Sequence, residues 1–164
     1  MSLDQRLTAQ FALEVGVTRT ANFSMPATVD RDLDRFTELV ITLAISAATH
    51  TSETYDLYIT TGDGYSQWDI IHFPQIASTG AKTFTARITS QNQIPTNVTT
   101  ANPGVSANDS AIFQTDTAGA NQGIKTLGAG IVRHAPWGDR IGYELVCAGG
   151  GSPSITYTIS VQGR

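Results

Sequence analysis

The segments FTELVITLAIS (36–46), THTSETYDLYITT (49–61), GDGYSQWDIIHF (62–73) and TGAKTFTARIT (79–89) decide the fold, because apolar and polar side chains alternate through them. An alternation with a period of two is typical of β-strands that bury one face. The pattern returns in IGYELVC (141–147) and ITYTISV (155–161). The predicted inward rows are Leu39, Ile41, Leu43, Ile45 and Ala47; Tyr55, Leu57 and Ile59; Trp68 and Ile70; Phe84, Ala86 and Ile88; Ile141, Tyr143, Leu145 and Cys147; and Ile155, Tyr157, Ile159 and Val161.

The N-terminal region adds one strand and one connection. Residues 7–18 alternate as well, and they predict a strand whose apolar row includes Leu13, Val15 and Val17. The stretch from Thr20 to Arg35 holds a proline and a charged run, so we expect a connection with about one helical turn.

The segment from Ser90 to Gly130 differs in character, because Asn, Thr, Gly and Ala dominate it. A loop of that length inside a compact domain is uncommon and usually functional. We expect short strands around Ala111 to Gln114 and Ile124 to Leu127, and another at Ile131 to His134.

These elements predict an all-β protein, an antiparallel β-sandwich or jelly roll of about eight strands with long loops. We expect residues 1–164 to form a single β-sandwich domain, with an N-terminal arm at 1–5 and a long insertion at 90–130.

Composition excludes several classes of function. The formal net charge is −4 and the ten Lys and Arg residues are scattered, so we expect no nucleic-acid partner. A single cysteine, Cys147, excludes an intrachain disulfide and a cysteine-based zinc site, and we expect it to be a buried, inert thiol. The start MSLDQRL lacks the apolar core of a signal peptide, and no stretch reaches the roughly 18 apolar residues of a membrane span. We therefore expect cytosolic synthesis and no membrane contact.

No catalytic, cofactor or metal constellation is recognisable. Asp30, Asp32 and Asp34 open like a calcium loop, but Arg35 and Ile41 occupy the positions of its glycine and its bidentate glutamate. The three histidines share no metal-binding spacing, and we expect the imidazole at position 72 to lie at a surface or a strand edge. The nucleophile elbow G-x-S-x-G is absent. We predict no enzyme, no cofactor and no metal.

The two tryptophans differ in their expected surroundings. Trp68 is in phase with Ile70 on a strand, which favours a core position. Trp137 lies in the turn HAPWGDR, and we expect it to be the better candidate for an exposed contact with a partner.

Two blocks resemble patterns found in small head proteins of tailed bacteriophages. LVITLAISAATHTSETYDLYITTGDGYSQWDIIHF (39–73) is similar to a recurring run of strand, Ser/Thr-rich turn, short strand, D-G hairpin and tryptophan-bearing strand. GDRIGYELVCAGGGSPSITYTISVQG (138–163) is similar to the C-terminal pattern of these proteins. The resemblance implies a capsid decoration, or cement, protein made in the host cytoplasm and located on the virion, where it binds the outer surface of the major capsid protein shell.

The expected contact residues follow from which stretches lie outside the core. We expect the arm formed by Met1, Ser2, Leu3, Asp4 and Gln5, together with the segment from Ser90 to Gly130 and Trp137, to contact the capsid. A homotrimer at a symmetry axis of the shell is the expected oligomer. The alternative is a carbohydrate-binding or adhesive β-sandwich module of a phage tail or head–tail component, with Trp137 as its aromatic platform.

Overall fold

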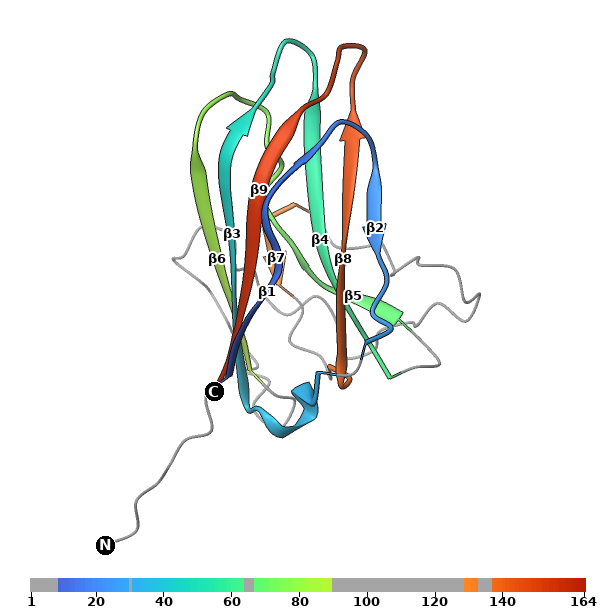
Figure 1. Cartoon of the computed structure of the whole chain (residues 1–164), viewed down its shortest axis with the longest axis vertical. Coiled ribbons are helices and arrows are strands. Elements are labelled where there is room, and N and C mark those ends of the chain that lie inside the picture. The colour runs from blue at the N-terminus through green and yellow to red at the C-terminus, as the bar shows by residue number, and fades with distance from the viewer. Residues whose placement is uncertain (1–8, 30, 64–66, 90–128, 133–136) are drawn as a thin grey trace, which may run out of the picture.

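The structure is a computed structural model that describes residues 9–29, 31–63, 67–89, 129–132 and 137–164, and its strands form two antiparallel sheets that pack face to face (Figure 1). Sheet A consists, in spatial order, of β1 (Ala9–Arg19), β9 (Ile155–Gly163), β3 (Glu38–Ala48) and β6 (Lys82–Thr89). Sheet B consists, in spatial order, of β2 (Phe23–Met25), β8 (Arg140–Ala148), β4 (Thr54–Gly62), β5 (Gln67–His72) and β7 (Ile131–Val132).

The strand pairs are nested along the chain. β1 pairs with β9, β2 with β8, β3 with β6 and β4 with β5, so the chain runs as one long double ribbon wrapped across two sheets. That wrapping is the topology of a jelly roll. β7 adds a short strand beside β5. The predicted all-β fold, an antiparallel β-sandwich or jelly roll, is confirmed, and the strand order is that of a jelly roll.

The core lies between the sheets and is built from the predicted apolar rows. Leu39, Ile41 and Leu43 of β3 have no exposed surface, and neither has Tyr157 of β9. Trp68 is buried too, as its phase on the strand predicts. Each large apolar side chain removed from water contributes roughly 1.5–3 kcal/mol, which makes these rows the main source of stability. Ala47 is exposed, after a register shift between Ile45 and Ala47, and Phe84 and Cys147 are only partly buried, which corrects the expectation of a buried thiol.

Strand β1 departs from the predicted alternation at Val15, which is 75% exposed rather than buried. The pairing with β9 shifts register twice, between Ala12 and Glu14 and between Glu14 and Val17. Gly16 has a φ of +58°, a conformation that glycine adopts without strain. The extra residues turn Glu14 inward, where the Tyr143 hydroxyl donates to its Oε1 at 2.7 Å.

The remaining elements are short. The turn η1 (Leu33–Arg35) is a 3₁₀ helix and confirms the expected helical turn in the connection after β1. β2 was not predicted, since three residues are too few to show a period. β7 confirms the first two residues of the strand expected at Ile131 to His134. The strands expected at Ala111 to Gln114 and at Ile124 to Leu127 lie outside the described residues.

Candidate partner-binding surface

One end of the sandwich carries the attachment points of two long segments of the chain (Figure 1). Ala9, which follows residues 1–8, pairs with Gly163, and Gly163 also pairs with Leu39. Thr89, which precedes residues 90–128, pairs with Glu38. Residues 1–8 and the start of residues 90–128 therefore adjoin the same end of sheet A, on its two outer strands, while the other end of residues 90–128 leads into β7 of sheet B. We call this end of sheet A the Glu38 end.

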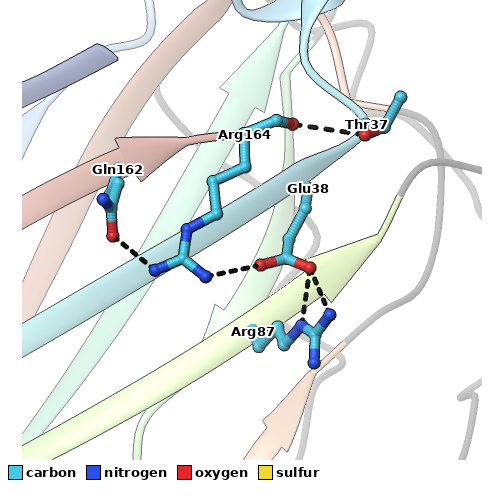
Figure 2. Close-up of polar contacts among 5 residues, drawn as sticks. All are labelled: Thr37, Glu38, Arg87, Gln162 and Arg164. Atoms are coloured by element: carbon cyan, nitrogen blue, oxygen red, sulfur yellow. Dashed lines mark hydrogen bonds and ion pairs between the residues drawn. The ribbon is translucent and has the colours of Figure 1, made fainter. Parts of the chain in front are cut away.

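A charged cluster formed by Glu38, Arg87 and Arg164 lies at the Glu38 end on the outer face of sheet A (Figure 2). Arg87 donates to Glu38 Oε2 from Nε at 2.7 Å and also from Nη2. Arg164 Nη1 forms a longer ion pair, 3.7 Å from Glu38 Oε1, while its Nη2 donates to Gln162 Oε1 at 3.1 Å. One carboxylate therefore orients two guanidinium groups.

The backbone of Arg164 is fixed to the start of β3. Its N–H donates to the Glu38 carbonyl oxygen at 2.9 Å, and its own carbonyl oxygen accepts from the N–H groups of Thr37 and Glu38 at 2.9 and 3.0 Å. The Thr37 hydroxyl donates to the same carbonyl oxygen at 3.2 Å (Figure 2). These bonds hold the Arg164 side chain beside Glu38.

Exposure divides the cluster into a covered anion and two exposed cations. The Glu38 side chain is 13% exposed, whereas those of Arg87 and Arg164 are 67% and 50% exposed. The part of the cluster that meets solvent is therefore the two guanidinium groups.

The rest of the outer face of sheet A is uncharged along its central rows. The side chains there point away from the core, because they alternate with the buried rows of the same strands. They are short and neutral over most of the face, and the row next to Glu38 contains two glutamines. The face comprises Gln10, Gln162 and Val40; Ala12, Ser160, Thr42 and Thr85; and Thr158, Ala44 and Thr83.

The outer face of sheet B carries a different group, formed by Asp56, Tyr58, Asp69, His72 and Glu144. His72 Nε2 lies 2.9 Å from Asp56 Oδ1, and the imidazole stacks on Tyr58 with 4.0 Å between ring centroids. Burial raises the pKa of Tyr58, and the charges of Asp56, Asp69 and Glu144 raise it further. Three carboxylates therefore lie near one phenol.

This sheet B group is largely buried. His72 is 5% exposed and Asp69 has no exposed surface, so the prediction of a surface or edge imidazole is wrong. Gln75 Nε2 donates to Asp56 Oδ2 at 2.9 Å, and Asp69, His72 and Glu144 make further polar or ring contacts. The group is an internal polar network, and sequence reasoning missed it. The available signal was the phase of Asp56 and Tyr58, which alternate with Tyr55 and Leu57.

Trp137 is buried, with 9% of its surface exposed, which overturns its expected role as an exposed contact. Its indole Nε1 donates to the carbonyl oxygen of Leu33 at 2.9 Å. The next residue, Gly138, donates from its N–H to Thr61 Oγ1 at 3.0 Å, and a Cβ there would lie 1.9 Å from the Gly62 carbonyl oxygen. Trp137 and Gly138 are thus packed inward, against Leu33 and against Thr61 and Gly62.

The predicted capsid-binding arm lies outside the described residues, and so do residues 90–128 of the predicted insertion. The arm consists of Met1, Ser2, Leu3, Asp4 and Gln5. Ala9 and Thr89 mark where these stretches join the sandwich. The thiol of Cys147 is half-buried, and burial raises its pKa, which favours the unreactive protonated form.

Among the described residues, no three His, Cys, Asp or Glu side chains are grouped so that they could hold a metal ion. The same part of the chain contains no helix with the length and apolar character needed to cross a membrane. Comparison of the chain with models of protein families, with curated proteins and with solved structures finds no match. A functional proposal therefore rests on the fold, the surfaces and the sequence.

Proposed function

We propose that the protein is a capsid decoration, or cement, protein of a tailed bacteriophage, which binds the outer surface of the major capsid protein shell and stabilises it. The observation that carries this proposal is the position of Ala9 and Thr89 at one end of sheet A. We assign the capsid contact to residues 1–5 and to the Asn/Thr-rich segment from Ser90 to Gly130, and Ala9 and Thr89 adjoin these stretches at this end of sheet A.

A β-sandwich core with long Asn/Thr/Gly-rich stretches suits a protein that clamps neighbouring subunits, because such stretches can cover wide surfaces. Many copies on one shell add weak contacts into a high total avidity. A trimer at a symmetry axis of the shell would place three such ends on neighbouring capsid subunits.

The jelly roll by itself does not choose between a shell protein and a sugar-binding module, because it serves both virion and lectin domains. Trp137 was the aromatic platform expected for the sugar-binding alternative. Its burial beneath the Leu33 turn removes that platform. Trp137 was also an expected capsid contact, so its burial removes it from both proposals, and the resemblance of residues 39–73 and 138–163 to phage head proteins is what favours the cement proposal.

The experiment that tests the proposal is binding of the full chain to purified expanded shells that lack the protein. We expect saturable binding and a higher temperature of shell disruption. A variant without residues 1–5 should bind more weakly, and a matched variant at the opposite end of the sandwich, Thr51→Ala, should bind as well as the unmodified chain. Undiminished occupancy and heat resistance after the deletion would contradict a role for the arm.

A further inference from the structure

We propose that Glu14, Arg19, Tyr143 and Tyr157 form a register lock, which holds the outer strand β1 in a bulged pairing with β9 although the apolar pattern of β1 also fits a regular pairing. Glu14 is its centre, because two of the other three side chains bind the Glu14 carboxylate and the third binds one of those two. This inference concerns the conformation of the sandwich and does not depend on the proposed function.

Two pairings of β1 are compatible with its apolar residues. Phe11, Leu13, Val15 and Val17 occupy every second position, so a regular strand would turn all four toward the core. In the structure the pairing shifts once before Glu14 and once more before Val17. The second shift returns Val17 to the core side, but the two shifts leave Val15 75% exposed. The observed pairing therefore forgoes the favourable burial of one valine.

The register lock supplies contacts that compensate for this loss. Glu14 Oε1 accepts from the Tyr143 hydroxyl at 2.7 Å and from Arg19 Nη2 at 2.9 Å. The Tyr157 hydroxyl donates to the Tyr143 hydroxyl at 3.1 Å, and burial raises the pKa of both phenols, so both keep their protons as donors. Because Tyr143 belongs to β8 and the other residues to β1 and β9, these bonds connect the two sheets.

The regular pairing would break the register lock. With Val17 kept opposite Tyr157, a strand without shifts places Val15 opposite Ile159, and position 14 then points away from the core. The Tyr143 hydroxyl, in a residue without exposed surface, would lose its charged acceptor, which is costly for a buried donor. The N-terminal half of β1 would also slide by two residues, about 7 Å at the spacing of a strand.

Gly16 provides the backbone conformation that the bulged pairing requires. Its φ is +58°, and its N–H donates to Thr158 Oγ1 at 2.9 Å. A Cβ at Gly16 would meet no atom within 4 Å, so only the positive φ opposes an alanine there. Gly80 is a matched control outside β1, because its φ is +93° and a Cβ there would be equally unobstructed.

The test determines the register of β1 against β9 by NMR of the full chain, from nuclear Overhauser effects between residues that face each other across the two strands. The decisive variant combines Glu14→Thr with Gly16→Ala, which removes the carboxylate and disfavours the positive φ. The controls are Gly80→Ala and the conservative variant Glu14→Gln, whose amide oxygen can still accept from Tyr143. Circular dichroism and thermal unfolding verify that each variant folds.

We expect the unmodified chain and both controls to show the observed register, with Ala12 opposite Ser160. The double variant should shift by two residues and show Val15 opposite Ile159. If the folded double variant keeps Ala12 opposite Ser160, or if its β1 separates from β9, the register lock is refuted.

Hydrogen exchange of Tyr143→Phe provides a second test that does not need the double variant to fold. Removal of the donor to Glu14 should accelerate amide exchange about tenfold more in β1 than in β3, because the register lock holds β1 and not the centre of the sheet. Equal acceleration in both strands would mean that the Tyr143 hydroxyl contributes only to overall stability, and it would overturn the proposal.

Discussion

The two outer faces of the sandwich are made by strands of the same alternating pattern, yet they differ in burial and in charge. On sheet A, Thr83, Thr85 and Arg87 are exposed, and most of the face is short and neutral. On sheet B, His72 and Asp69 are buried and the face is rich in carboxylates. The difference shows that alternation tells which residues point away from the core, but not whether they meet water. The outer face of sheet A is thus the accessible one, whereas polar side chains on the outer face of sheet B mainly contact one another.

The largest expected effect concerns Trp137, which sequence placed on an accessible surface and the structure places in the core. Trp137→Ala should lower the free energy of unfolding by about 3–5 kcal/mol, because it leaves a cavity and removes the donor to the Leu33 carbonyl. Urea unfolding followed by fluorescence of Trp68 measures this change. If the free energy of unfolding falls by less than about 0.5 kcal/mol, as it does for ordinary surface substitutions, Trp137 is exposed to solvent rather than buried.

The next effect tests whether the sheet B face is internal. His72→Ala removes the ring stacked on Tyr58 and leaves Oδ1 of the mostly covered Asp56 side chain, which is 16% exposed, without that partner. We expect a loss of about 2 kcal/mol in the free energy of unfolding, since orphaned buried polar groups are costly. Chemical denaturation of the unmodified chain and of His72→Ala measures the difference in the free energy of unfolding. Near-equal stabilities would mean that water reaches this face.

A pH titration examines the same face without altering its shape. Burial and nearby carboxylates raise the pKa of Tyr58 above its ordinary value near 10, so the folded chain holds that proton more tightly than the unfolded chain. The stabilisation from the neutral phenol is therefore complete below pH 10 and is lost as pH rises from about 10 through the higher folded pKa.

The ultraviolet difference between the unmodified chain and Tyr58→Phe isolates this phenol from Tyr143 and Tyr157, whose pKa values burial also raises. We expect the Tyr58 component to ionise above pH 10. Ionisation at or below pH 10 would show that the phenol is solvated, and the contrast between the faces would weaken.

The smallest effect is expected on the sheet A face. Thr85→Ala removes one exposed hydroxyl that lies 3.2 Å from the Thr42 hydroxyl, and it should change the free energy of unfolding by less than about 0.5 kcal/mol. Differential scanning calorimetry is sufficient to detect a larger shift. A loss comparable to that of His72→Ala would mean that the two faces are equivalent in stability.

The local sequence pattern was sufficient to predict the fold, because the inward rows of β3, β4, β8 and β9 consist of apolar residues at every second position. It failed where long-range geometry decides. The inward turn of Glu14 depends on two register shifts against β9. The contact between Asp56 and His72 depends on the register of β4 and β5, which shifts between Ile59 and Thr60.

The charged cluster was beyond sequence reasoning for the same reason. Glu38, Arg87 and Arg164 belong to three segments far apart in the chain, and only the order β9-β3-β6 brings them together. The burial of Trp137 likewise required the Leu33 turn to lie over it, which no local pattern indicates. The position of Ala9 and Thr89 at one end of sheet A became visible only through the pairing of Ala9 with Gly163 and of Thr89 with Glu38.

The proposed decoration role makes the chain a stoichiometric component of the capsid surface. Quantitative mass spectrometry of purified virions measures it directly, as the molar ratio of this chain to the major capsid protein. The decoration role predicts a fixed ratio that is the same in heads purified without tails. Absence of the chain from virions, or its presence in tails alone, would contradict that role.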